Sequence, residues 1–427
     1  MHGKVHMTID SDIDTAGDLD EIGKLLAADD ATRLLEAYEP GSSFFFSSAR
    51  ATMLARGVDA TVPKIECGRS GLSDRVAQFL TGARDFGRRN PLVVGAVPFG
   101  ENLPAHLVLP REVVRAAPPN VMVPSASAPR PLSCRMRQVP APEEYERGVA
   151  RVLRRMQSGE LSKVVLARSL ELSADEPIDV RRLLRNLALK DPGGYTFAVD
   201  LPARGQDGTR DSFGPHPELH RTFAGASPEL LVSRRGISVR SNPMAGSRPR
   251  SADPLEDRRR AEELEDSEKD LREHAAVVEA VTDALRPLCT TLRVPRRPSV
   301  VATAAMWHLA TEITGELRDP DTSSLDLAVA LHPTPAVCGT PTAEAGRAIT
   351  ENEPFDRGYY AGVVGWCDAA GDGEWVVAIR CTEVEDASLR LYAGAGVVAG
   401  SDPADELAET SAKFRTALAA MGLDHAL

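Results

Sequence analysis

Two short segments of the sequence carry pairs of carboxylates spaced three residues apart. The segment SEKDLREH contains Asp270 and Glu273, and the segment DPADELAETSAK contains Glu406 and Glu409. Residues at positions i and i+3 lie on one face of an α-helix. Two such faces that converge would present four carboxylates without sulfur or imidazole, a ligand set that suits Mg²⁺ with several retained waters. Two solvated helix faces are the alternative that the spacing leaves open.

A lysine and several glycines accompany the second acidic pair. Lys413 follows Glu409 by four residues, which is also the spacing of an ordinary ion pair within a helix. Residues 392–400, YAGAGVVAG, include Gly394 and Gly396 and precede the predicted helix. Glycines near a helix start would expose backbone N–H groups, which bind anions. A tight connection from strand to helix is the alternative interpretation.

Lys163 and Glu229 are candidates for moving protons. Lys163 lies among β-forming residues in SKVVL, where it either projects from a strand edge or points into a site. Burial in a site would favour the neutral amine that a general base needs. Glu229 follows a proline and precedes apolar residues in GASPELL, and desolvation there would raise its pKa enough for a general acid. Taken alone, each residue also fits an exposed position.

Arg380 and two histidines occur in apolar surroundings. Arg380 follows the apolar residues 375–379, and a cation at such a position is costly unless it meets an anion. Its guanidinium could bind a carboxylate through two parallel hydrogen bonds. His308 in MWHL and His332 in LHP are ambiguous, since a lone histidine in an apolar segment is more often a structural residue than a catalyst.

The elements that must position these residues include both strands and long helices. Helices are predicted at 143–159, where the apolar residues follow the helical period, at 258–285 and at 403–421. Strands are predicted at 43–47, 92–97, 161–172, 195–200, 230–233, 238–241, 362–367, 375–381 and 389–393, with 230–233 paired to 238–241. This pattern indicates an α+β fold with large antiparallel sheets flanked by helices.

The composition of the 427-residue chain bounds its partners and compartment. Its net charge of −12 gives no general attraction to nucleic acid or an anionic membrane surface, so an anionic substrate would need a local cationic pocket or a metal ion. No apolar run reaches the ~18 residues of a membrane-spanning helix, and the N-terminus lacks a signal-peptide pattern. Six scattered cysteines without a zinc spacing suit free thiols in a reducing cytoplasm.

One domain accounts for most of the chain. Residues 1–20 are polar and acid-rich and are predicted to form a loose leader. A single domain then covers 21–427, with an N-terminal part at 21–116 and a catalytic core at 143–427. Between them, residues 117–142 are rich in proline and serine, which predicts a surface crossover without regular structure.

Nine segments in one order carry a family resemblance. They are SKVVLAR, GASPELLV, NPMAGSRPR, SEKDLREH, WHLAT, LHPTPAVCGTP, EPFDRGYYAGVVGW, GEWVVAIRC and AGAGVVAGSDPADELAET. Together they resemble the chorismate-utilising enzymes, with the fold of anthranilate synthase component I, and most closely the siderophore-type isochorismate synthases. The resemblance covers roughly 143–423, with weaker similarity at 41–57, and Met244 stands where the family usually has leucine.

The resemblance implies a site between antiparallel sheets and a role for each candidate. Lys163 would activate water for attack at C2 of the chorismate ring, and Glu229 would protonate the departing C4 hydroxyl. Glu273 and Glu409 would ligate Mg²⁺, with the other two carboxylates of the acidic pairs acting directly or through water. Water is a poor nucleophile and hydroxide is a poor leaving group. A base on one side of the ring would activate the water, and an acid on the other side would protonate the departing hydroxyl.

The resemblance also implies how each carboxylate of the substrate is held. The ring carboxylate would meet the metal, the N–H groups around Gly394 and Gly396, and Lys413. Arg380, with Tyr360, would bind the enolpyruvyl carboxylate. Chorismate is a dianion, so one metal and one arginine supply a counter-charge to each end. Gly246 and His308 would line the pocket.

Two features choose among the reactions of this family. Relatives that use ammonia typically lack the lysine at position 163, so its presence favours water. Salicylate synthases share the lysine but eliminate pyruvate, and there the loop equivalent to 333–339 carries threonine where this chain has Ala336. The sequence therefore favours a reaction that stops at isochorismate, with salicylate synthase as the alternative.

Two further alternatives belong to other functional classes. One is an inactive relative that only binds chorismate, and the other is an unrelated Mg²⁺-dependent phosphoryl-transfer enzyme, for which the motif GxxxxGK[ST] is missing. For the favoured reaction the resemblance implies 2,3-dihydroxybenzoate siderophores rather than menaquinone, an isochorismatase as the next enzyme in the pathway, and a monomer or weak dimer.

Overall fold

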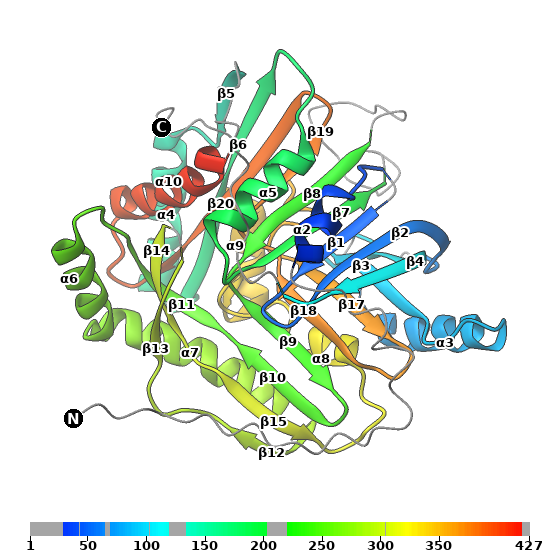
Figure 1. The fold of residues 1–427 in the computed structure, drawn as a ribbon. Helices are drawn as coiled ribbons and strands as arrows, with labels where there is room; N and C mark the ends of the chain where they lie inside the picture. Colours follow the sequence, from blue (N-terminus) through cyan, green and yellow to red (C-terminus); the bar gives the residue numbers. More distant parts are fainter. Residues whose placement is uncertain are drawn as a thin grey trace, which may run out of the picture.

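The computed structural model describes residues 29–41, 43–64, 69–101, 103–118, 134–202, 220–303 and 305–420. The predicted leader, Cys67 and most of the predicted crossover lie outside these ranges. The described residues form a 17-stranded sheet, a three-stranded sheet and helices that pack on both, so the prediction of an α+β fold is confirmed (Figure 1). No helix among them combines the length and apolar character that crossing a membrane requires.

The large sheet is antiparallel at every strand pair, and the pairs trace one path. In order of pairing, its strands are β12 (Cys289–Arg293), β15 (Ile313–Leu317), β10 (Ser238–Asn242), β9 (Leu230–Arg235), β18 (Gly373–Val377), β17 (Val363–Asp368), β3 (Leu92–Val97), β4 (His106–Ala116), β2 (Thr52–Thr61), β1 (Ser43–Ser47), β7 (Tyr195–Leu201), β8 (Arg221–Ser227), β19 (Cys381–Glu385), β20 (Ser388–Val398) and β6 (Lys163–Ala174). Strand β6 also pairs with β5 (Cys134–Val139) and with β16 (Gly339–Thr340).

Three hydrophobic clusters hold these layers together. The largest takes side chains from both halves of the strand path, such as Phe197 and Phe223 from one half and Val94 and Val364 from the other. A second cluster includes apolar side chains of α2 (Asp29–Glu36), α5 (Val180–Lys190) and α10 (Pro403–Ala420). A third joins α4 (Pro142–Gln157) and α9 (Thr342–Asn352) to β6. Strand β3 is buried at every position, as expected for a strand covered on both faces.

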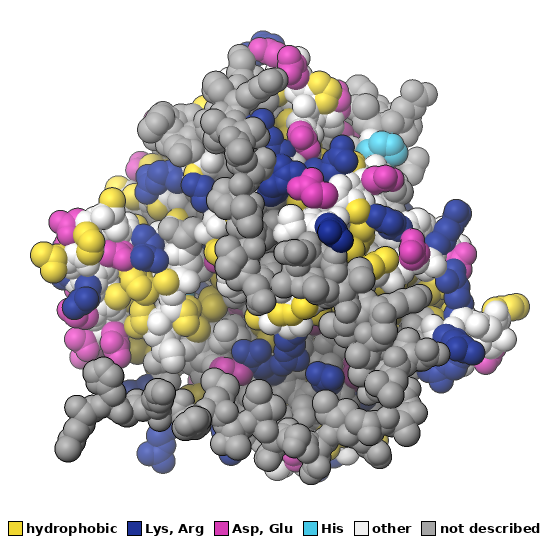
Figure 2. All heavy atoms as spheres, in the orientation of Figure 1, with side chains coloured by type: hydrophobic (Ala, Val, Ile, Leu, Met, Phe, Trp, Pro, Cys, Tyr) yellow, Lys and Arg dark blue, Asp and Glu magenta, His cyan; other side chains and the backbone are white. Residues whose placement is uncertain are grey.

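The small sheet lies at one side of the molecule and carries part of the site. It consists of β11 (Met244–Pro249), β14 (Met306–Ala310) and β13 (Ser299–Ala302), next to α6 (Pro254–Glu265) and α7 (Glu268–Leu285). Figure 2 shows hydrophobic side chains at the surface over this region, and Leu255 of α6 is 80% exposed. The remaining helices are α3 (Leu72–Asp85) and α8 (Ser324–Leu331).

Three expectations about the elements need correction. The helix predicted at 258–285 is two helices, because α6 ends at Glu265 with Asp266 as its C-cap, and Ser267 caps the start of α7 by accepting a hydrogen bond from the Asp270 N–H. The strand predicted at 375–381 is divided between β18 and β19, since Arg380 adopts a positive φ of 51° between them. The crossover predicted to lack regular structure contains β5, which pairs with β6 along its whole length.

A buried ion pair ties the loop before β16 to strand β6. Arg357 and Glu353 have side chains 3% and 2% exposed, and their two contacts are 2.8 and 2.5 Å long. Arg357 also donates to the carbonyl oxygens of Val337 and Val165, both at 2.8 Å. Glu353 accepts from the Ala167 N–H at 2.8 Å. Because every one of these groups is buried, the pair fixes where β6 and the loop meet.

We expect Glu353→Ala to lower the free energy of unfolding by roughly 3–5 kcal/mol, because it leaves the Arg357 guanidinium buried without its counter-charge. The matched control is Glu351→Ala, which breaks the contact with Arg155 at a side chain that is 61% exposed. That change should cost less than about 1 kcal/mol. Urea unfolding followed by circular dichroism measures both, and equal effects of the two substitutions would contradict the argument.

Candidate active site

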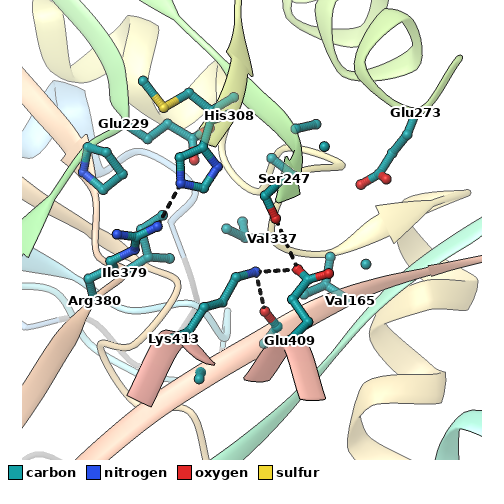
Figure 3. A pocket seen from close by; sticks show the side chains of 18 of the residues that line it. Val165, Glu229, Ser247, Glu273, His308, Val337, Ile379, Arg380, Glu409 and Lys413 are labelled. Atoms are coloured by element: carbon teal, nitrogen blue, oxygen red, sulfur yellow. Dashed lines mark hydrogen bonds and ion pairs between the residues drawn. The ribbon is translucent and has the colours of Figure 1, made fainter. Parts of the chain in front are cut away.

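One cleft brings together residues from distant parts of the chain (Figure 3). It is lined by every predicted substrate-binding residue, by Glu229 and by all four predicted metal ligands, namely Gly246, His308, Ala336, Tyr360, Arg380, Gly394, Gly396, Lys413, Asp270, Glu273, Glu406 and Glu409. Lys163 does not line the cleft directly and lies behind Gly396. The elements that meet here are the small sheet, α7, α10, β20 and the loops that flank β9 and β19.

The two predicted acidic faces converge on one side of this cleft. We call the four carboxylates, Asp270 and Glu273 of α7 with Glu406 and Glu409 of α10, the acidic wall. Among the described residues, no three His, Cys, Asp or Glu side chains form a group that could already hold a metal ion. Each carboxylate of the wall instead contacts a cation, at nitrogen–oxygen distances of 2.8 Å for Lys163–Glu273, 2.8 Å for Arg248–Asp270, 2.7 Å for Lys413–Glu409 and 3.9 Å for Lys269–Glu406.

The charges on the acidic wall are unevenly balanced. Burial, followed by the neighbouring charge of Glu409, raises the pKa of Glu406 to about 7 against smaller opposing effects. Burial also acts on Glu273, but the charge of Lys163 and its hydrogen bond leave the pKa of Glu273 below its usual value. The raised pKa of Glu406 means that this position favours added positive charge. Carboxylate oxygens alone, with this demand for charge, fit a hard divalent cation.

Glycines allow the acidic wall to approach strand β20. A Cβ atom on Gly396 would lie 2.8 Å from Glu273 Oε1 and 3.4 Å from Lys163 Cε, and one on Gly394 would lie 2.9 Å from the Tyr360 hydroxyl. Both glycines belong to β20 itself, so the prediction of a glycine-rich turn at the start of the helix is wrong for them. Their role is to leave space, and the Gly394 carbonyl accepts a hydrogen bond from Lys413 at 2.8 Å.

Lys163 and Glu229 are both buried, with 4% and 3% of their surface exposed. Lys163 begins β6, between partners in β16 and β20. Glu229 lies between β8 and β9, where its N–H donates to Ser227 Oγ at 3.2 Å. Burial raises the pKa of Glu229 to about 7, partly opposed by the Met244 N–H and the two nearby lysines. Glu229 can therefore give up a proton near neutral pH.

Arg380 forms the cationic end of the cleft. Its positive φ turns the chain between β18 and β19, and its guanidinium donates to Thr303 Oγ1 at 3.0 Å. A second nitrogen lies 2.6 Å from His308 Nε2. Burial, followed by the charges of Arg380 and Lys413, holds the pKa of His308 well below its usual range. The imidazole is therefore neutral, and its Nε2 accepts the hydrogen bond.

Several residues of the cleft were not among the predicted site residues. Arg248 and Ser247 lie in the quoted NPMAGSRPR segment and Lys269 in SEKDLREH, so these motifs held a signal for them. Ser247 Oγ lies 3.4 Å from Glu409 Oε1. No feature of the sequence pointed to Thr303, which reaches Arg380 only through the fold. His332 lies outside the cleft and donates to the Ala361 carbonyl at 2.7 Å, which is a structural role.

The chain was compared with known families and structures. The family model described as chorismate binding enzyme matches residues 120–422. This chain belongs to the chorismate-binding enzymes. This chain is 53% identical to isochorismate synthase DhbC of Bacillus subtilis, and the match covers 92% of this chain and 97% of DhbC. The vibriobactin-specific isochorismate synthase of Vibrio cholerae is 41% identical, over 92% and 94%.

Solved structures of chorismate-binding enzymes have the same fold. A crystal structure described as a putative 2,3-dihydroxybenzoate-specific isochorismate synthase, DhbC from Bacillus anthracis, is 51% identical with a TM-score of 0.84, and covers 92% of this chain and 99% of that one. Anthranilate synthase component I from Streptococcus pneumoniae, at 20% identity and a TM-score of 0.63 over 90% and 91%, shares the fold alone. The predicted family and its fold are confirmed.

The raised pKa of Glu229 predicts a pH-dependent stability. The unfolded carboxyl loses its proton near its ordinary pKa, but the folded one keeps it up to about pH 7, so the free energy of unfolding falls as pH rises between these values. Glu229→Gln should remove this loss, which amounts to up to roughly 3 kcal/mol at pH 8. Urea unfolding without metal at pH 5 and pH 8 measures the difference between variant and wild type. The exposed Glu279→Gln on α7 is the control, and a parallel response of both variants would refute the prediction.

Proposed function

We propose that this chain is an isochorismate synthase, which converts chorismate to isochorismate by moving the ring hydroxyl from C4 to C2 with water as nucleophile. The observation that carries the proposal is a buried glutamate that lines the cleft, with its pKa raised to about 7, together with a buried lysine that contacts Glu273 in the cleft wall. The cleft also has Arg380 and the acidic wall to meet two anionic groups. Two relatives, at 53% and 41% identity, are named as isochorismate synthases.

In the proposed reaction Lys163 and Glu229 handle the protons. Lys163 acts as the base and takes a proton from water as the water oxygen bonds to C2. The ring double bond shifts, the C4–O bond breaks, and Glu229 gives its proton to the departing hydroxyl, which leaves as water. Transfer of a proton from Lys163 to Glu229 then restores both groups. The pKa of Glu229 near neutrality suits this donor, because the acid form is populated at the operating pH.

The two carboxylates of chorismate require two cationic positions. Arg380, whose guanidinium is held by Thr303 and His308, would bind the enolpyruvyl carboxylate, close to Tyr360. The acidic wall would hold Mg²⁺, with Glu273 and Glu409 as ligands and Asp270 and Glu406 acting directly or through water. When bound, Mg²⁺ supplies positive charge for the ring carboxylate. Lys413, fixed between Glu409 and the Gly394 carbonyl, adds a further cation on that side.

The proposal extends to the product and the compartment. Ala336 lines the cleft where salicylate synthases carry threonine, which favours a reaction that stops at isochorismate. Relatives named for 2,3-dihydroxybenzoate and vibriobactin support a supply of isochorismate to catechol siderophores, with an isochorismatase acting next. The described cysteines are all free thiols, which supports a reducing cytoplasm. The enzyme would act there as a monomer or weak dimer.

Incubation of the purified protein with chorismate and Mg²⁺ should yield isochorismate, in a mixture that retains chorismate because the hydroxyl transfer is reversible. EDTA should abolish the product, and added Mg²⁺ should restore it. Liquid chromatography with standards of both compounds measures the outcome. Salicylate and pyruvate as the main products would assign the chain to the lyase branch instead, and no conversion would leave a relative that only binds chorismate.

Lys163→Ala and Glu229→Gln should each lower kcat by about 100-fold or more, because each removes one proton-transfer group. In the wild type, kcat should fall as pH rises through about 7, since Glu229 must carry a proton to act. Glu229→Gln should lack this fall. The exposed Lys190→Ala on α5 is the control. A pH–rate profile that neither active-site substitution alters would exclude the assigned roles.

A further inference from the structure

Lysine is scarce in this chain, and its few positions are informative. Only seven of the 50 Lys and Arg residues are lysines. Three of those seven, Lys163, Lys269 and Lys413, make ion pairs with the acidic wall. Elsewhere in the described core, arginine makes buried contacts of this kind, as in the Arg357–Glu353 and Arg390–Glu171 pairs. Lysine, which is rare in the rest of the chain, is therefore concentrated at the acidic wall.

The two cations differ in how firmly they hold a carboxylate. Arginine presents a rigid planar fork that can donate two parallel hydrogen bonds, whereas the lysine ammonium is a compact point charge on a flexible stem. Arg357 contacts both oxygens of Glu353, while Lys163 contacts a single oxygen of Glu273. A lysine partner can therefore leave a carboxylate more easily than an arginine partner can.

The contact between Lys163 and Glu273 occupies one of the two oxygens that Glu273 can offer to a metal. Glu273 Oε1 lies 2.8 Å from Lys163 Nζ, and the same oxygen is the atom closest to the space beside Gly396. Both side chains are largely buried, with 5% and 11% exposed. A metal that binds Glu273 through Oε1 would compete with Lys163 for this oxygen and would repel its ammonium. A displaced lysine would then need another polar partner, because its side chain is buried.

We propose that the three lysines occupy the acidic wall in place of Mg²⁺, and that metal binding exchanges them, so that Lys163 is released from Glu273 only in the metal-loaded protein. This inference rests on the proposed function, since it assumes that the wall binds Mg²⁺ and that Lys163 is the base. It also explains why metal binding would precede proton transfer, because Lys163 is held in an ion pair with Glu273 until the metal is bound.

The three lysines differ in what the exchange would do to them. Lys413 keeps its hydrogen bond to the Gly394 carbonyl when Glu409 turns to a metal, so it stays in the cleft. Lys269 is 45% exposed and lies 3.9 Å from Glu406, so it can turn toward solvent. Lys163 is the buried one, and the exchange therefore changes its surroundings most.

Calorimetric titration of the metal-free protein with Mg²⁺, without substrate, tests the exchange. Lys163→Met removes the competing amine and should tighten Mg²⁺ binding by roughly fivefold or more. Lys163→Arg keeps the charge but holds Glu273 through a fork, so it should weaken Mg²⁺ binding. Lys190→Met, an exposed position on α5, should leave the affinity unchanged, and thermal unfolding of each variant verifies folding.

The arginine variant separates exchange from simple repulsion between charges. If repulsion alone acts, Lys163→Met binds more tightly but Lys163→Arg matches the wild type, and the proposal is overturned. A second measurement needs no substitution: acetylation of the wild-type protein by an amine-reactive ester, read by mass spectrometry, should modify Lys163 several times faster with Mg²⁺ than with EDTA, while Lys190 reacts equally in both. Equal rates at Lys163 would also overturn it.

These experiments distinguish a failure of the proposed exchange from a failure of the proposed function. If Mg²⁺ binds and isochorismate forms while the Lys163 variants and acetylation rates show no exchange, the proposed function stands and the exchange does not. If calorimetry detects no binding of Mg²⁺ to the metal-free protein, the exchange fails, and product analysis still decides the reaction.

Discussion

Pairing of buried charges is the constraint on which the rest of this structure depends. An ionised group removed from water costs several kcal/mol unless a counter-charge and hydrogen bonds replace its hydration. The described fold nevertheless buries Lys163 and Arg357 and half-buries Arg380, each within reach of a specific partner. Lys163 and Arg380 meet partners from distant parts of the chain, and Arg357, whose carboxylate partner is four residues away, also donates to the remote Val165 and Val337 carbonyls. These charges can therefore be accommodated only after the sheets and helices have reached their final positions.

The same pairing explains why a cleft with reactive groups is compatible with a stable fold. Arg357 and Glu353 fix β6 against the loop that carries Ala336, and so keep Lys163 at its place on β6. The neutral His308 holds Arg380 without cancelling its charge, which leaves that charge available to an anionic ligand. The charge of Arg357 is thus matched by the Glu353 carboxylate, whereas Arg380 donates to the neutral groups of Thr303 and His308.

The sequence predicted the elements well where periodicity or turn residues decide them, as in α4 and the β9–β10 hairpin. It failed where a single residue interrupts a pattern: the cap at Ser267 divides a helix, and the positive φ of Arg380 divides a strand. Most residues that line the cleft and were predicted for the site were singled out through ordered motifs, which are local. Their partners, such as Thr303 for Arg380, depend on how remote segments meet, and no local pattern encodes that.

The space left by Gly396 has a consequence for how this protein can change over generations. A single nucleotide substitution that alters a glycine codon either adds a side chain or stops translation, so no mild replacement is one step away. A Cβ atom there would collide with Glu273 Oε1 at 2.8 Å. Selection therefore keeps glycine at this position, and inherited variation in how the acidic wall approaches β20 must arise from residues on α7 and α10 instead.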